Sequence, residues 1–253
     1  MNDRLPVFDD LTEYRSTSDA VELFPFTVRV ARNRAQLQRV AALKSSAYGR
    51  HKLIIKNSNS FIAELSAPDT YLTFVAEDKA TGAPVGSVRV QNKAMHPYLF
   101  LKELKVPFHL SRVQSVCVSR LCVIRGPIGS LARNALCKAV YLYAVSMQCR
   151  YKFAFVDEAR RRLYSTMGFV PVFKDDPELC LPSNDNIPFK LQVFDVASAE
   201  SAWKGMGHPL YNFVLNTFHP DIEIFSSVAS FSDTRRISDS IPDVTGVTLL
   251  PII

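Results

Sequence analysis

The run Val116-Cys117-Val118-Ser119-Arg120-Leu121-Cys122-Val123-Ile124 decides how this chain is expected to fold. Its apolar and β-branched residues predict a strand, and an Arg-Gly-Pro turn follows it. A long amphipathic helix pattern begins at Pro127, because proline is well tolerated in the first turn of a helix. A second apolar strand is expected at Lys152–Val156 and a short helix at Tyr164–Phe169. Together these segments predict one strand-helix-strand crossover unit.

Further strands and helices flank this unit. The earlier runs alternate apolar and polar residues as half-buried strands do, and a connection rich in turn formers at 78–84 predicts an antiparallel hairpin. Asn33 is a suitable N-cap for the helix after the first strand. Strands are expected at Phe26–Val30, Tyr71–Ala76, Val85–Val90 and Phe189–Phe194, with a further helix at Ser198–Lys204. The pattern predicts an α+β fold with a mixed, mostly antiparallel sheet flanked by helices.

The length and composition fit one large globular domain with extensions, because 47% of the 253 residues are hydrophobic and 21% are charged. Residues 1–24 are expected to be a loosely ordered lead-in, residues 25–230 the folded domain, and residues 231–253 a C-terminal extension. The N-terminus lacks the layout of a signal peptide, and no uncharged apolar run approaches the roughly 20 residues that cross a bilayer. A cytoplasmic protein without a transmembrane segment is expected.

The net charge of +6 and the pI near 9.1 favour an acidic partner. The basic residues are scattered and do not interleave with aromatic residues along a stripe, so nucleic acid is not the expected partner. The densest cluster is Arg160-Arg161-Arg162, with Arg125 and Arg133 in the same unit. Such a cluster suits an acidic carrier protein or an anionic phosphate arm, and it equally suits the solvated start of a helix.

Cysteine and histidine patterns indicate no metal site. Five cysteines without a Cys-x-x-Cys pair indicate neither a disulfide framework nor a zinc site, and all five are expected to be buried. Cys117 and Cys122 are five positions apart, so an unbroken strand would point them to opposite faces. The pairs His208-Pro209 and His219-Pro220 are too isolated for metal ligation and are expected to have structural roles in turns.

The alternation of the deciding strand separates its side chains into two sets. Cys117, Ser119, Leu121 and Val123 are expected on one face, and Arg120 in the middle of the other, apolar face. A buried arginine is costly unless it is paired. Arg120 is therefore expected to form a buried ion pair or to donate to a carboxylate or thioester carbonyl, and one residue can do both.

The turn after this strand presents backbone N–H groups at the start of a helix, which is a natural site for an anionic phosphate. The turn reads Arg125-Gly126-Pro127-Ile128-Gly129-Ser130. Pro127 removes one N–H donor from this set. The sequence therefore predicts an anion site with few backbone donors.

Four segments together resemble the long-chain N-acyl amino acid synthases, the carrier-dependent branch of the GNAT superfamily of acyltransferases, related to the acyl-homoserine lactone synthases. The segments are Ala47–His51, Val118–Val123, Leu163–Phe169 and Gly207–Phe213, the last continued by Thr217–Ile222. The resemblance spans roughly residues 26–225. It implies a GNAT-like acyl-CoA N-acyltransferase fold and the transfer of a long acyl chain from acyl carrier protein to the α-amine of an amino acid.

The resemblance also implies roles for individual residues. Ser119 and Arg120 are implied at the acyl-donor strand, Tyr164 as the acid that protonates the leaving thiolate, and His51 as a base for the amine. The pKa of tyrosine lies above that of a thiol, as this protonation requires. Tyr164 could instead be a half-buried core residue, and His51 a structural one. Implied in substrate binding are Arg50, Cys117, Leu121 and Val123.

The phosphate turn has fewer glycines than the usual GNAT pyrophosphate loop. This difference favours the single phosphate of a carrier-borne phosphopantetheine, held by Arg125, Gly126, Gly129 and Ser130, over the pyrophosphate of coenzyme A. No tightly bound cofactor is expected. The acyl-phosphopantetheine of acyl carrier protein would be a co-substrate, with acyl-CoA as the alternative donor.

One position departs from the pattern of the resembled enzymes. They commonly carry Glu-x-Ser-Arg in this strand, and Cys117 occupies the Glu position here. If that Glu helps to activate the amine, either His51 substitutes for it or the activity is altered. Two other functions remain open: a non-catalytic module that binds an acyl carrier or lipid, and an acetyl-CoA-dependent N-acetyltransferase. The acceptor amino acid, the acyl chain length and the oligomeric state are not identified by the sequence.

Overall fold

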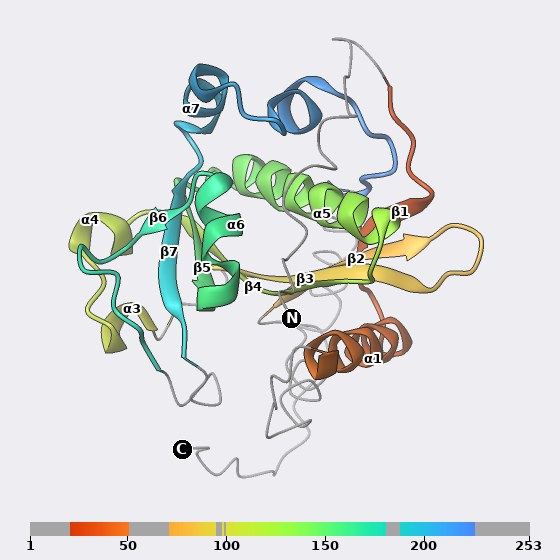
Figure 1. The fold of residues 1–253 in the computed structure, drawn as a ribbon, viewed down its shortest axis with the longest axis horizontal. Coiled ribbons are helices and arrows are strands. Elements are labelled where there is room, and N and C mark those ends of the chain that lie inside the picture. Colours follow the sequence, from red (N-terminus) through yellow and green to blue (C-terminus); the bar gives the residue numbers. More distant parts are fainter. Residues whose placement is uncertain (1–20, 51–70, 95–97, 99, 181–187, 226–253) are drawn as a thin grey trace, which may run out of the picture.

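The computed structural model describes residues 21–50, 71–94, 98, 100–180 and 188–225, in which a seven-stranded sheet is flanked by helices (Figure 1). The strand order is β1-β2-β3-β4-β5-β7-β6. β4 and β5 are parallel neighbours, and the other neighbouring pairs are antiparallel. The predicted α+β fold with a mixed, mostly antiparallel sheet is therefore confirmed.

The elements closely follow the sequence pattern. The strands are β1 (Phe26–Val30), β2 (Leu72–Asp78), β3 (Pro84–Asn92), β4 (Ser115–Val123), β5 (Tyr151–Val156), β6 (Val170–Pro171) and β7 (Lys190–Asp195). The α-helices are α1 (Arg34–Arg50), α3 (Phe100–Glu103), α4 (Phe108–Ser111), α5 (Pro127–Ser146), α6 (Arg161–Thr166) and α7 (Ala199–Met206). A 3₁₀ turn, η2 (Glu158–Arg160), precedes α6, and a π-helical turn, η4 (Asn212–Asn216), follows α7.

Local sequence signals explain where the helices begin and end. Asn33 Oδ1 accepts the backbone N–H of Gln36 at 2.9 Å and so satisfies a free donor at the start of α1. Pro127 occupies the first turn of α5, as predicted. Gly207 ends α7 in the left-handed conformation, with φ of 60°. The edge strand β6 is not predicted by the sequence, because two residues are too few to show an alternation.

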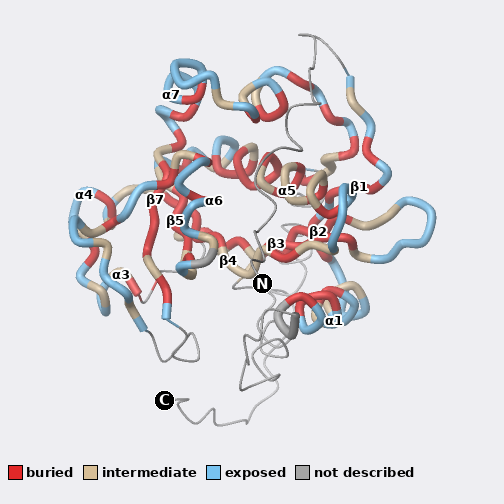
Figure 2. The backbone as a smooth tube through the Cα atoms, in the orientation of Figure 1, coloured by how far each residue is buried: buried red, intermediate tan, exposed pale blue. Residues whose placement is uncertain are grey.

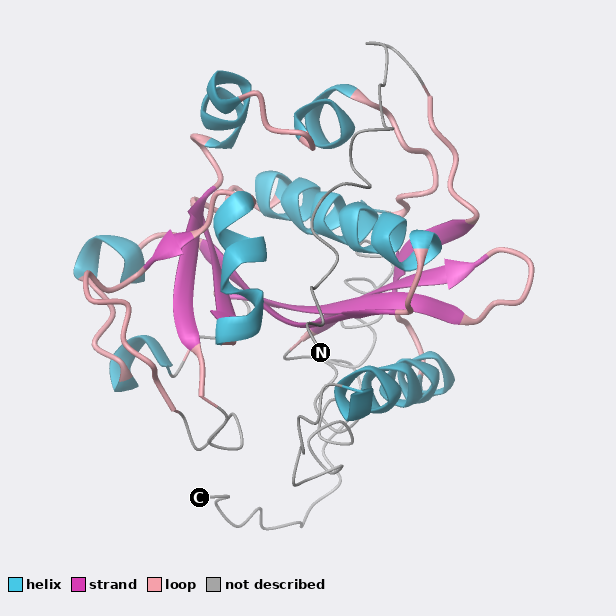
Figure 3. Cartoon of the chain, in the orientation of Figure 1, coloured by secondary structure: helices cyan, strands magenta, loops and turns pink. Residues whose placement is uncertain are grey.

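Helices cover both faces of the sheet (Figures 1 and 3). α5 lies on one face and α1 on the other, while α7 and η4 lie beyond α5, away from the sheet. The main hydrophobic core fills the α5 side, and a second cluster lies on the opposite face of β5 and β7, where α3 and α4 pack. The central strands are mostly buried, whereas α7 and the β2–β3 connection are mostly exposed (Figure 2).

A β-bulge interrupts the predicted alternation along β4. Val88 of β3 stands opposite two residues of β4, Arg120 and Leu121, because the register shifts between the flanking pairs. The inserted residue reverses the face that each later side chain meets. Leu121 therefore lies on the α5 side with Val118, and the expectation that it shares a face with Cys117 is wrong.

The same bulge corrects the expectation for the cysteines. Cys117 packs in the second cluster and Cys122 against Leu43 and Ala47 of α1, so both lie on the face away from α5. An unbroken strand would have separated them. The expectation that all five cysteines are buried is also wrong, because Cys180 is exposed. All five thiols are free.

Residues 21–24 lie against the later segment 218–221. Val21 forms a bridge with Phe218, and Asp221 Oδ2 accepts the backbone N–H of Phe24 at 2.7 Å. The predicted domain boundaries stay predictions, since residues 1–20 and 226–253 lie outside the described residues. Within the described ranges, no helix has the length and apolar character needed to cross a membrane.

Candidate functional site

β4 and β5 separate part of the way along their length. They pair from Ser115 opposite Tyr151 to Val118 opposite Ala154. Beyond this point β4 runs on beside β3, and β5 runs on beside β7. In the described part of the chain, no strand pairs with the two facing edges there.

The bulge of β4 lies at this point of separation. Arg120, its first residue, has φ of 54° and is half-buried. A left-handed conformation costs a residue with a side chain about 1–2 kcal/mol relative to the right-handed one. A bulge bends and twists its strand, which explains why β4 diverges from β5. The expectation that Arg120 is buried in a continuous apolar face is wrong, because the bulge breaks that face.

The β4–α5 turn brings together the four residues predicted to hold a phosphate. Gly126 has φ of 91°, which favours glycine, and no side chain caps the start of α5. A Cβ at Gly129 would lie 1.9 Å from the carbonyl oxygen of Ile124, so only glycine permits this approach of helix and strand. Arg125 is exposed and Ser130 half-buried. The N–H groups of the first helical turn are suited to an anion.

An apolar cavity of about 40 Å³ lies beside the bulge on the α5 face, lined by Leu121 and Tyr164 among others. The Tyr164 ring packs edge-on against Phe169, with 5.1 Å between ring centroids. Gly168, with φ of 88°, makes the turn between these two rings. A Cβ at Gly168 would lie 3.2 Å from Trp203 Nε1. The Tyr-x-x-x-Gly-Phe segment therefore forms one wall of the cavity.

Ser119 and Cys117 lie on the opposite face from this cavity. Ser119 Oγ accepts a hydrogen bond from Arg89 Nε at 2.9 Å, and the Arg89 guanidinium lies 4.3 Å from the centre of the Tyr71 ring. Burial raises the pKa of the Cys117 thiol to about 12. The structure thus divides the sequence-predicted residues between the two faces of the sheet at the separation of β4 and β5.

The structure describes only some of the residues predicted to bind the substrate or activate its amine. Arg50 is the last residue of α1, and its side chain lies outside the described part of the chain. His51 lies outside the described residues altogether. Val123 is half-buried and packs against the main core. The roles of these three residues stay predictions.

The sequence patterns do not single out Lys152 of β5, which lines the cavity and is only 6% exposed. Burial lowers the pKa of its ammonium to about 8. The sequence nevertheless contains a signal that could have identified Lys152. Alternation puts it on the same strand face as Ala154 and Val156, which are buried, and an apolar side chain is expected at such a position. Trp203 of α7, the only tryptophan of the chain, lines the same cavity.

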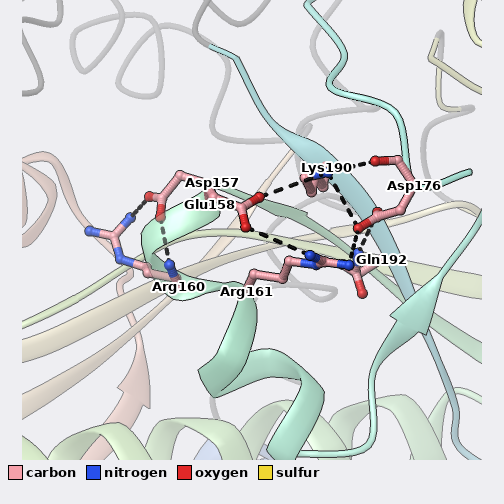
Figure 4. Close-up of polar contacts among 7 residues, drawn as sticks. All are labelled: Asp157, Glu158, Arg160, Arg161, Asp176, Lys190 and Gln192. Carbon is pink, nitrogen blue, oxygen red and sulfur yellow. Dashed lines mark hydrogen bonds and ion pairs between the residues drawn. The ribbon is translucent and has the colours of Figure 1, made fainter. Parts of the chain in front are cut away.

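The predicted arginine triplet is largely paired with acidic residues (Figure 4). Arg160 pairs with Asp157, and Arg161 lies 2.8 Å from Asp176. Only Arg162, which is exposed, has no ion pair with a residue that the structure describes. The same network also contains Glu158, Lys190 and Gln192. Much of the positive charge of the triplet is therefore balanced within the protein.

His208 and His219 have hydrogen-bond partners on both ring nitrogens, which agrees with structural roles. Nε2 of His208 lies 2.7 Å from the Thr166 carbonyl, and its Nδ1 accepts a backbone N–H at 3.1 Å. His219 lies between Lys138 and Glu22, at 2.8 and 3.1 Å. Among the described residues, no group of three His, Cys, Asp or Glu side chains could hold a metal ion.

The mixed sheet whose parallel strands separate at a bulge, followed by a glycine turn and a long helix, agrees with the GNAT-like fold that the resemblance implied. The chain is similar to FeeM, an N-acyl amino acid synthase from uncultured soil microbes, with 14% identity and a TM-score of 0.55 over 70% of this chain and 93% of FeeM. At this identity the likeness shows the fold.

The chain is also similar to the GNAT family N-acetyltransferase YhbS of Escherichia coli in complex with CoA, with 16% identity and a TM-score of 0.49 over 79% of this chain and 92% of that one. No family profile and no curated protein sequence matches the chain.

Proposed function

We propose that this protein is an N-acyltransferase that moves a long-chain acyl group from acyl carrier protein to the α-amine of an amino acid, giving an N-acyl amino acid. The observation that carries the proposal is the separation of β4 and β5 beyond Val118 and Ala154, beside an apolar cavity. An acyl-pantetheine arm needs a slot edged by peptide groups that leads to apolar space. The likeness of fold to FeeM supports the same class of reaction.

The donor arm is suited to the place where β4 and β5 diverge, because its amides can bond backbone groups as an added strand does. The turn at Gly126–Ser130 suits its phosphate, and Pro127 reduces the number of N–H donors there. Fewer donors favour one phosphate over a pyrophosphate, and so favour the carrier-borne arm over coenzyme A. The acyl chain then enters the cavity past Leu121, where the flexible Met167 can move to accommodate it.

The reaction forms a bond between the amine nitrogen and the thioester carbonyl carbon and breaks the C–S bond. The amine gives one proton to a base, and the departing thiolate receives one. In our proposal the Tyr164 hydroxyl, in the cavity wall, donates this second proton. A tyrosine pKa ordinarily lies above that of a thiol, so the hydroxyl is protonated at neutral pH.

The base that accepts the amine proton is not the residue at the Glu position of the strand motif. Cys117 stands there, and since burial raises its pKa to about 12, its thiol stays neutral. We assign the base to His51, and the recognition of the amino acid carboxylate to Arg50, whose guanidinium can form two parallel hydrogen bonds. Arg50 is the last residue of α1, and His51 follows it in the sequence.

The carrier protein is expected to dock where β4 and β5 end. Arg125 follows β4, and Arg162 lies in the first turn of α6, the helix after β5; both residues are exposed. The carboxyl ends of parallel strands lie at one edge of a sheet. Arg162→Glu should raise the KM for the carrier-borne substrate, whereas Lys102→Glu on α3 is the control and should not. Added salt should also weaken carrier binding, because exposed charges are screened beyond about 10 Å at 0.1 M.

Incubation with long-chain acyl carrier protein, long-chain acyl-CoA, acetyl-CoA and mixed amino acids, followed by mass spectrometry, tests the proposal. We expect N-acyl amino acids, formed fastest from the carrier. Acetylated amino acids alone would identify an acetyltransferase. Carrier binding without any product would identify a non-catalytic module. Equal or faster turnover with the long-chain coenzyme A thioester would contradict the preference for the carrier.

A further inference from the structure

Lys152 is a buried cation inside the apolar cavity. Its Nζ lies 4.0 Å from the centre of the Phe194 ring, 5.5 Å from that of Phe169 and 5.6 Å from that of Tyr141. No hydrogen bond or ion pair joins the ammonium to any residue in the described part of the chain. The faces of aromatic rings attract a cation, but they replace only part of its lost hydration.

Lys138 of α5 is a second buried lysine, and its ammonium has a hydrogen-bond partner for each donor. Its Nζ donates to the carbonyl oxygens of Phe213, at 2.8 Å, and Thr217, and it lies 2.8 Å from Nδ1 of His219. An ammonium has three donors, and these contacts use all of them. Lys138 is 4% exposed and Lys152 is 6% exposed. The two lysines are equally buried, and only Lys138 is satisfied by the protein.

A second donor in the same wall also lacks an acceptor. Trp203 Nε1–H is buried and has no hydrogen-bond partner among the described residues. The Trp203 ring lies 5.8 Å from Phe194 and 6.5 Å from Tyr141, between centroids, so it belongs to the aromatic group that surrounds Lys152. A buried donor without an acceptor is costly. Lys152 and Trp203 therefore both lack an acceptor within the described part of the chain.

We propose that this cavity binds a fatty acid, with its carboxylate on the Lys152 ammonium and its alkyl chain against the apolar lining. A carboxylate neutralises the buried charge and accepts charge-assisted hydrogen bonds from the ammonium. A cavity of about 40 Å³ admits only the carboxylate end, so the alkyl chain enters along the apolar lining, which includes Leu121 and Leu136, as the flexible Met167 moves aside. The acyl chain of the proposed donor would enter the same cavity, but the inference stands apart from the proposed reaction, because fatty-acid binding can be measured without an acyl donor.

The groups around Lys152 determine the pH range in which the site is charged. Cys137 and Tyr141 of α5 and Tyr164 of α6 are the titratable side chains that face it, and burial raises the pKa of Cys137 and of Tyr141. Glu200 of α7, an exposed carboxylate, further raises the pKa of Tyr141. Burial lowers the pKa of Lys152 to about 8. Lys152 is therefore a cation at pH 7 that loses its charge above about pH 8.

The fluorescence of Trp203 reports directly on the cavity, since the chain has no other tryptophan. Titration of the full chain at pH 7 with decanoate should change this emission saturably. Decanol lacks the charge and acetate lacks the chain, so each should bind at least about tenfold more weakly. Raising the pH from 7 to 9 should weaken the binding of decanoate and leave that of decanol unchanged. Equal affinities for decanol and decanoate would overturn the inference.

Lys152→Met removes the charge and keeps an apolar stem of similar length. This variant should bind decanoate about 10- to 100-fold more weakly than wild type. It should also melt about 2–4 °C higher or more, because an unpaired buried charge has been removed. Lys204→Met, on the exposed surface of α7, is the matched control and should change neither value. A Lys152→Met protein that melts lower, or that binds decanoate as wild type does, would show that Lys152 has a structural role.

Discussion

Nδ1 of His219 lies 2.8 Å from Nζ of the buried Lys138, and this contact fixes the ring as a neutral acceptor. The ring proton is then on Nε2, which lies 3.1 Å from Glu22. A proton on Nδ1 would place a second positive charge against the ammonium. Burial and the charge of Lys138 accordingly lower the pKa of His219. The three side chains join α5 to the segments before β1 and after η4.

The free energy of unfolding should therefore decrease as the pH falls below about 6.5. The folded pKa of His219 lies below the unfolded value, so the unfolded chain binds more protons in this range. Burial also lowers the pKa of His208, which contributes with the same sign. Thermal melts between pH 8 and pH 5 measure the slope. His219→Gln should make it shallower, while His109→Gln on α4 should not. An unchanged slope in His219→Gln would show that the ring is not responsible.

Gly129→Ala should destabilise the protein by at least about 1–3 kcal/mol, because the new Cβ would lie 1.9 Å from the Ile124 carbonyl oxygen. Gly205→Ala, in α7, is the opposite case. A Cβ there meets nothing within 4 Å, and alanine in a helix should stabilise by about 0.5–1 kcal/mol. Urea denaturation of the two variants checks both signs. A Gly129→Ala protein as stable as wild type would mean that α5 can shift away from β4.

Arg120→Gly should be at least as stable as Arg120→Ala, although glycine in a strand is ordinarily less stable than alanine by about 0.5–1 kcal/mol. The reason is the φ of 54° at Arg120, which alanine adopts at a cost and glycine does not. Both variants lose the same guanidinium, so their difference isolates the backbone of the bulge. Melting temperatures that place alanine clearly above glycine would contradict a left-handed residue here.

Tyr164→Phe should lower the single-turnover rate by roughly 10²–10⁴, the usual contribution of a positioned acid, with little change in donor binding. The substitution keeps the edge-on contact with Phe169 and removes only the hydroxyl. Single-turnover kinetics are needed, because slow product release could hide a chemical defect. Tyr151→Phe, a half-buried tyrosine on β5, is the control. A folded Tyr164→Phe protein with the wild-type rate would reduce Tyr164 to a core residue.

Local patterns in the sequence determined the elements around the site. Runs of apolar and β-branched residues gave β4 and β5, the three-to-four spacing gave α5, and Pro127 marked the first turn of that helix. Gly126 and Gly168 also mark turns in the sequence, because glycine is the residue that best tolerates positive φ. Both adopt such φ values in the structure. These features depend on neighbours in the chain, so the order of residues is enough to specify them.

Tertiary structure alone decided how these elements present their side chains. The bulge opposite Val88 reversed the faces of β4 beyond Ser119, because register is set by the pairing with β3 and not by β4 itself. Arg161 of the triplet was paired with Asp176, which lies beyond β6 in the chain. Lys152 became an unpaired cation only because α5, α6 and α7 close an apolar cavity over it. The charge of a side chain is given by the sequence, but its partners depend on which distant segments meet in the fold.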